Sequence, residues 1–140
     1  MQQWSTSVYN CEKQCIYRNI KFESCHEKYL NLCSNVYLLT KLRSGTLTLN
    51  IELGQYNNTP RESRLCVCCN MNVVENEYHV VLVCPAYRSV RTHVLPTYYC
   101  SWPNIYQLEH LLKAANKNLT IKLYNYRKTP WKIRCHIITY

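Results

Sequence analysis

Apolar residues recur at helical spacing over much of the chain. Across residues 3–33 they return about every 3.6 positions with no internal proline, which predicts helical structure. A second helix is predicted to begin after Ser34, whose side chain can cap it, and to end at Gly45, which tolerates the positive φ of a helix stop. Two cations near its end, Lys41 and Arg43, complement the helix dipole.

The pattern changes after Gly45. Leu47, Leu49 and Ile51 alternate with polar residues, which predicts a short strand or extended segment, and residues 54–60 are expected to form a loop. Further on, leucines and isoleucines at helical spacing predict two amphipathic helices, divided at residues 116–118. Pro130 is expected to end the second of them.

Between these regions lies a nineteen-residue stretch with the pattern C-x2-C-x9-H-x4-C. Three thiolates and one imidazole form the ligand set of a closed tetrahedral zinc site, so we expect one structural Zn²⁺. The predicted ligands are Cys66, Cys69, His79 and Cys84. Cys68 could replace either neighbour, but adjacent cysteines rarely aim both sulfurs at one ion. Asn70 is expected to take positive φ in the turn. The alternative is a set of free core cysteines beside an unrelated histidine.

His79 and Cys84 fit a short helix with an acidic first turn. Five residues apart on an unbroken α-helix, they would point about 140° away from each other. Pro85 disfavours helical geometry at Cys84 and can open a new helix through Arg91. We therefore expect a break that turns the Cys84 sulfur back toward His79.

The predicted fold class is mainly α, with a small α+β fold as the alternative: a helical domain with a zinc-stapled hairpin or loop leading into a helix. We expect a helical region over 3–65, a zinc-binding module over 66–95 packed with it as one domain, and a basic helical tail over 96–140. Two glycines in 140 residues disfavour a turn-rich β sandwich or barrel.

Ten cysteines accompany a start that lacks the charged and apolar regions of a signal peptide. They therefore indicate reduced thiols and metal ligands, in a cytoplasmic or nuclear protein without a membrane span. A disulfide-linked secreted protein is the alternative.

The composition argues against catalysis. The chain has no aspartate, the residue that commonly holds catalytic Mg²⁺, and two glycines cannot build a phosphate-binding loop. We predict no enzyme activity and no small-molecule substrate. A cysteine nucleophile paired with a histidine stays open, with no motif behind it; the candidates are Cys11, Cys15, Cys25 and Cys100.

The net charge of +9 is concentrated in residues 96–140, where seven Lys and Arg face Glu109 alone. Cations and aromatic rings alternate there, which suits phosphates and unpaired bases. The predicted nucleic-acid contacts are Lys122, Tyr126, Arg127, Lys128, Trp131, Lys132 and Arg134. The alternative is a solvated helix face with its tyrosines packed inward. Four arginines flank the predicted metal, where they can balance its charge or contact phosphate; they are Arg61, Arg64, Arg88 and Arg91.

An ordered set of residues resembles the C-terminal zinc-binding part of reverse transcriptases from invertebrate non-LTR retrotransposons. The matching pieces include Trp4, Cys15–Arg18, Thr59–Arg64, Glu77–His79 and Cys84–Tyr87. The resemblance covers about residues 4–92 and implies a segment that holds template RNA or target DNA. The polymerase core is missing, so the chain is not a reverse transcriptase by itself.

Three positions depart from the family. It usually has histidine at Thr46, proline at Asn50 and arginine at Gln55, which weakens the case for a nucleic-acid contact near residues 43–55. The predicted function is a non-catalytic zinc module that binds RNA or single-stranded or target DNA. The alternative is a zinc-stapled protein-interaction domain, or a truncated retroelement remnant without independent function.

Overall fold

The computed structural model describes residues 37–113 and 117–138, without the side chains of residues 37–39, 117, 120, 127 and 138. These residues are mainly helical, which confirms the predicted class. The elements are α3 (Tyr37–Ser44), α4 (Asn50–Tyr56), η3 (Arg61–Ser63), η4 (His79–Val83), η5 (Pro85–Tyr87), α5 (Arg88–Val94), α6 (Thr97–Ser101), α7 (Ile105–Leu112) and α8 (Lys117–Ile138). The predicted helix over residues 3–33, with Cys11, Cys15 and Cys25, lies outside the described residues.

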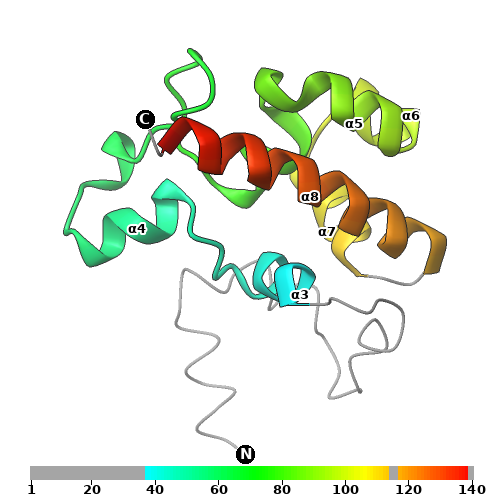
Figure 1. The fold of residues 1–140 in the computed structure, drawn as a ribbon, viewed down its shortest axis with the longest axis horizontal. Helices are drawn as coiled ribbons and strands as arrows, with labels where there is room; N and C mark the ends of the chain where they lie inside the picture. The colour runs from blue at the N-terminus through cyan, green and yellow to red at the C-terminus, as the bar shows by residue number, and fades with distance from the viewer. Residues whose placement is uncertain (1–36, 114–116, 139–140) are drawn as a thin grey trace, which may run out of the picture.

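Helix α8 crosses the middle of the molecule, with α5 and α6 on one side and α3 and α4 on the other (Figure 1). It packs against α5 and α7. One buried apolar cluster runs from Leu42 near the start of the described chain to Tyr126 on α8. The predicted boundaries at residues 65 and 95 do not interrupt this cluster, and α8 forms part of the core. Within the described ranges, no helix has the length and apolar character needed to cross a membrane.

The end of α3 follows the sequence prediction. Gly45 has φ of 67°, the left-handed conformation that suits a residue just past a helix. Its N–H bonds to the Leu42 carbonyl, and the N–H of Thr46 bonds to the Lys41 carbonyl. This hydrogen-bonding pattern satisfies the last carbonyls of the helix and turns the chain toward α4.

Of the short strand or extended segment predicted over Leu47–Ile51, no strand forms, although the backbone of Leu49 is extended. Residues 46–49 form a short connection, and α4 begins at Asn50 and continues through the predicted loop residue Gly54. The N-cap residue Leu49 makes no side-chain cap. Glu75 supplies it instead: its carboxylate accepts the N–H of Asn50 at 2.8 Å, and its carbonyl accepts the N–H of Ile51 at 3.1 Å. A cap from a residue so far along the chain leaves no local signal.

The two predicted tail helices are present as α7 and α8, but Pro130 does not end the second. α8 continues through it to Ile138, although a proline removes one hydrogen bond from a helix. Tyr126 and Arg134, one turn to either side of the proline, are both buried and hydrogen-bonded to the rest of the protein. These contacts hold both halves of α8 against one core, and they outweigh the local preference.

Candidate metal centre

The first two predicted ligands lie in a tight turn. Antiparallel pairing closes its base, because the N–H of Cys66 bonds to Val73 O and the N–H of Glu75 bonds to Arg64 O, each at 2.9 Å. The residue with positive φ is Asn72, at 53°, and not the expected Asn70. Asparagine tolerates this conformation better than most residues, so the physical reason was right and the position was wrong.

The other two ligands lie at the ends of a short helix over residues 77–83. The Asn76 side chain caps it by accepting the N–H of His79 at 2.8 Å. From His79 to Val83 the helix is wound as a π-helix, and the N–H of Cys84 reaches back to His79 O at 2.6 Å. An i→i+5 hydrogen bond brings residues five apart close together, where an α-helix would separate them. Cys84 then leaves the helix with ψ of 122°, as a residue before proline prefers.

These two segments bring all four predicted ligands together. The ligand atoms of Cys66, Cys69, His79 and Cys84 all lie within 4.8 Å of one another. Cys69 Sγ is 3.3 Å from His79 Nε2, and Cys66 Sγ is 4.0 Å from Cys84 Sγ. Tetrahedral zinc with about 2.3 Å bonds to sulfur would separate two ligand atoms by about 3.8 Å. The cluster can therefore hold a metal ion.

The sulfurs of Cys66 and Cys84 lie 4.0 Å apart, and either can donate the hydrogen bond between them. This hydrogen bond, followed by burial, raises the pKa of the Cys66 thiol to about 12. The same hydrogen bond lowers the pKa of the Cys84 thiol. A metal bound by Cys66 would therefore displace a proton from that thiol.

Cys68 lies outside the four-ligand cluster. The Cys68 sulfur accepts a hydrogen bond of 2.9 Å from the hydroxyl of Tyr87, which is fully buried. Burial raises the pKa of the Cys68 thiol. It lies within 4.8 Å of Cys66 Sγ and a Glu75 oxygen. Both oxygens of that carboxylate accept hydrogen bonds from Arg134. The geometry therefore favours Cys69 over Cys68 as the candidate ligand.

Glu75 connects the ligand turn to two other elements. Its carboxylate is fully buried, and Oε1 lies 3.9 Å from Cys66 Sγ. Arg134 of α8 donates to Oε1 at 2.9 Å and to Oε2 at 2.7 Å, while the backbone of Asn50 donates to Oε2. The sequence indicated only an acidic helix start here, and the structural role of Glu75 was missed.

The carbonyls at the end of the ligand helix are satisfied by side chains. In a π-helix, Val80 O would accept a hydrogen bond from the N–H of residue 85. Residue 85 is a proline and has no N–H. The hydroxyl of Tyr126 donates to Val80 O at 3.0 Å instead. The guanidinium of Arg91 donates to Cys84 O at 2.9 Å and, more weakly, to Val83 O. The buried Arg91 thus has a structural role.

The other flanking arginines divide into two kinds. Arg64 is half-buried and donates to Ile51 O and Thr59 O, each at 2.9 Å, which ties α4 to the ligand turn. Arg61 and Arg88 are exposed. Only the exposed pair is accessible to a phosphate.

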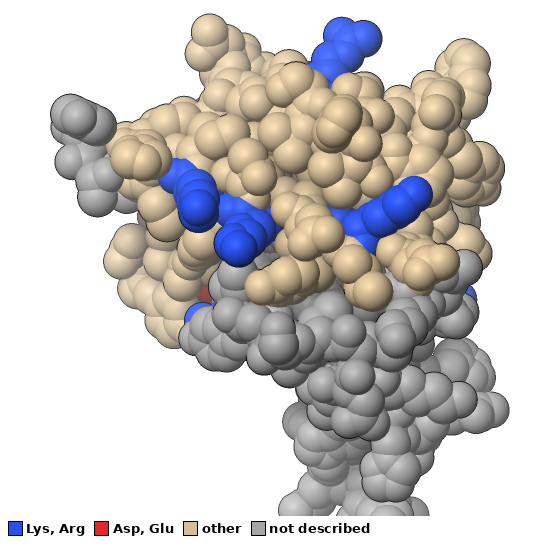
Figure 2. Space-filling view, turned by 45° about the vertical axis from the view of Figure 1, so that its right-hand side comes forward, with Lys and Arg blue, Asp and Glu red and all other residues tan. Residues whose placement is uncertain are grey.

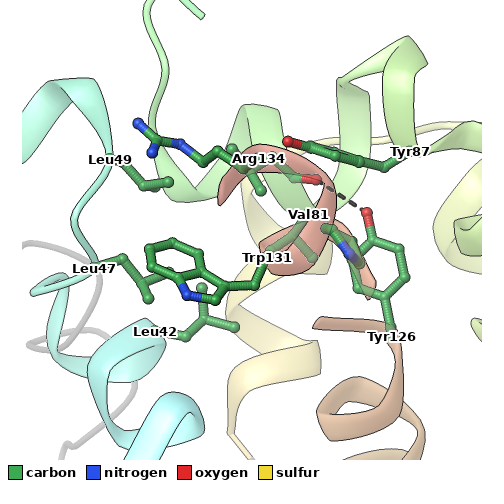
Figure 3. A pocket seen from close by; sticks show the side chains of 10 residues that line it. Leu42, Leu47, Leu49, Val81, Tyr87, Tyr126, Trp131 and Arg134 are labelled. Atoms are coloured by element: carbon green, nitrogen blue, oxygen red, sulfur yellow. Dashed lines mark hydrogen bonds between the residues drawn. The ribbon is translucent and has the colours of Figure 1, made fainter. Parts of the chain in front are cut away.

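The predicted nucleic-acid contacts on α8 need a correction. Tyr126 and Arg134 are buried, so they cannot reach a ligand at the surface. Trp131 is half-buried and lies against Leu42 and Leu47, and the Arg134 guanidinium lies 5.9 Å from its ring (Figure 3). These residues face inward because their helical positions coincide with the buried side of α8. Arg127's side chain lies outside the described residues.

Lys122, Lys128 and Lys132 are exposed, as a phosphate contact requires. Carboxylates are scarce around them, because Glu52, Glu75 and Glu77 are buried. Among the described residues Glu62 is the exposed acid and Glu109 is half-buried. One face accordingly shows a row of basic side chains with very little acidic surface (Figure 2). Three arginines, Arg43, Arg91 and Arg134, are buried as well, so the net positive charge of the described residues stays at the surface.

Comparisons with protein-family models, with curated proteins and with solved structures find no match. The resemblance to reverse transcriptases therefore stays a prediction.

Proposed function

We propose that this chain is a zinc-binding module, without chemistry of its own, that binds RNA or single-stranded DNA. The observation that carries the proposal is the convergence of three thiols and one imidazole within 4.8 Å. Soft thiolates select Zn²⁺ over hard cations such as Mg²⁺ or Ca²⁺, and four protein ligands leave no open position for catalysis. The ion would be structural.

The exposed lysines support the nucleic-acid part of the proposal. Lys128 and Lys132 lie one turn apart on α8, so both can follow one phosphate backbone, and Lys122 lies nearer the start of the helix. Neutralised phosphates release counterions, which makes such binding sensitive to salt. The resemblance to retrotransposon reverse transcriptases points to the same ligands, template RNA or target DNA, and we propose a common origin with that segment.

Metal content tests the first part of the proposal. Protein purified without added zinc should contain one zinc per chain. Cys84→Ser should lose the metal, because it removes a buried ligand, whereas Cys68→Ser should keep it. Protein without metal, or loss of metal from both variants equally, would contradict the assigned site.

Salt-dependent binding tests the second part. The zinc-loaded chain should bind a fluorescein-labelled single-stranded RNA with an affinity that falls steeply from 50 to 200 mM salt. Lys128→Glu/Lys132→Glu should weaken the binding and reduce the salt slope, whereas Lys41→Glu on α3 is the matched control. Salt-insensitive binding to protein and none to nucleic acid would favour the protein-interaction alternative.

A further inference from the structure

Large aromatic side chains lie exposed where α6 turns into α7. Trp102 is 81% exposed, Tyr106 is 78% exposed and Tyr98 is 66% exposed. We call Tyr98, Trp102 and Tyr106 the aromatic corner. Large aromatic side chains contribute most to stability when they are buried, so three exposed ones between positions 98 and 106 indicate a binding site.

The aromatic corner continues into a basic groove. Tyr106 and His110 lie one turn apart on α7, and Lys113 is the C-cap residue of this helix; all three are exposed. His110 and Lys113 also line a groove of about 460 Å³, which reaches α8. The other lining residues are Pro96, Tyr99, Asn118, Leu119 and Lys122. Among the described residues, no carboxylate lines the groove, and Glu109 on α7 is half-buried.

Hydrogen bonds hold this region in one conformation. The Gln107 side chain donates to Tyr98 O, and the Asn104 side chain caps α7 by accepting the N–H of Gln107, each at 3.0 Å. The hydroxyl of Tyr78, beside the metal ligand His79, donates to Pro103 O at 2.9 Å. The backbone that carries the exposed rings is therefore tied to the candidate metal centre, so little backbone freedom is left to lose on binding.

Side-chain contacts also order the wall of the groove. Tyr99 is buried, and its hydroxyl lies 2.7 Å from His110 Nδ1. The ring of Tyr98 meets that of Tyr99 edge-on, with the centroids 5.2 Å apart. This chain of ring contacts connects the aromatic corner to the groove that carries Lys113 and Lys122.

Exposed flat rings beside a cationic groove suit an unpaired nucleic-acid strand. Bases stack on aromatic side chains, while the phosphates between them need cations at a similar spacing. A purely apolar protein partner would gain nothing from the lysines, and a duplex would keep its bases away from the rings. We propose that the aromatic corner is a base-stacking platform for single-stranded RNA or DNA, whose phosphates follow the groove to Lys113 and Lys122. This inference rests on the proposed nucleic-acid function and assigns it a site.

The test compares a labelled oligouridylate with an abasic strand of the same length, using the zinc-loaded full chain. Trp102→Ala/Tyr106→Ala should weaken oligouridylate binding at least about tenfold, because each lost stack contributes about a fivefold effect or more. It should leave the salt slope and the affinity for the abasic strand unchanged. Lys113→Ala/Lys122→Ala should weaken binding to both strands and lower the salt slope by about two.

Tyr56→Ala on α4 is the matched control. Tyr56 is also exposed, at 72%, and it is not among the residues that line the groove. Zinc content and circular dichroism establish that each variant is folded. If the wild-type chain binds RNA and Trp102→Ala/Tyr106→Ala binds it equally well, the platform is refuted while the proposed function stands. If the wild-type chain binds neither strand, the proposed function itself fails. Self-association that the double variant abolishes would then identify a protein-docking surface.

Discussion

Arg134 on α8 forms a buried ion pair with Glu75, which lies beside the cluster of Cys66, Cys69, His79 and Cys84. Its guanidinium nitrogen Nη2 lies 2.7 Å from Glu75 Oε2, and the two side chains are only 4% and 0% exposed. The same carboxylate lies 3.9 Å from the Cys66 sulfur and caps the start of α4. One carboxylate thus couples the metal site to elements on both sides of it in the sequence.

We predict that Arg134→Met destabilises the zinc-loaded protein by about 3–5 kcal/mol, because it leaves the Glu75 charge buried without its cation. Glu75→Leu/Arg134→Met should cost much less than the sum of the two single changes. Urea denaturation of the four proteins measures this coupling. Additive costs would contradict the coupling between Glu75 and Arg134. If a folded Arg134→Met protein binds RNA with a reduced salt slope, Arg134 is a phosphate contact after all.

Tyr126→Phe should lower the free energy of unfolding by about 1–3 kcal/mol, because Val80 O would lose its donor inside the core. The phenylalanine ring keeps the apolar contacts of the tyrosine. RNA affinity should not change, since Tyr126 is buried. A loss of RNA affinity without a loss of stability would instead support the base-contact role that the sequence suggested. Tyr124→Phe, on a half-buried neighbour, is the control.

Zinc uptake should release protons and strengthen as the pH rises. The pKa of the Cys66 thiol is raised to about 12, so this thiol is protonated at pH 7 in metal-free protein and must lose its proton to bind zinc. Below that pKa, a higher pH lowers the cost of deprotonation and increases the apparent affinity. Calorimetric titration at pH 7 in buffers of different ionisation enthalpy measures the release. A value of zero would contradict thiolate ligation.

Gly54→Ala should destabilise the link between α4 and the ligand turn. A Cβ at Gly54 would lie 2.5 Å from two carbons of the Arg64 side chain, so that side chain would have to move. Its hydrogen bonds to Ile51 O and Thr59 O would be strained or lost. We expect a cost of about 1–3 kcal/mol by thermal unfolding, as for other overpacked sites. Arg64→Ala in the same background should remove most of the clash. Equal stability of Gly54→Ala and the wild type would refute the close packing.

The sequence by itself determined the features that depend on spacing and on local backbone preference. The clustering of Cys66, Cys69, His79 and Cys84 followed from the cysteine and histidine intervals, and the break at Cys84 followed from Pro85, which restricts the residue before it. Gly45 ended α3 because few other residues accept its φ of 67°. Each of these signals acts within a few residues, so no tertiary contact was needed to find it.

Only the tertiary structure decided how distant groups satisfy one another. Glu75 caps α4 from 25 residues away, and Tyr126 supplies a donor that Pro85 cannot, 46 residues from its acceptor. The direction in which each aromatic side chain of the C-terminal region faces was decided in the same way. Tyr126 and the exposed Trp102 both belong to the aromatic-rich C-terminal region, and only packing places one in the core and the other at the surface. Buried polar groups need partners wherever the fold brings them, and local sequence does not encode that position.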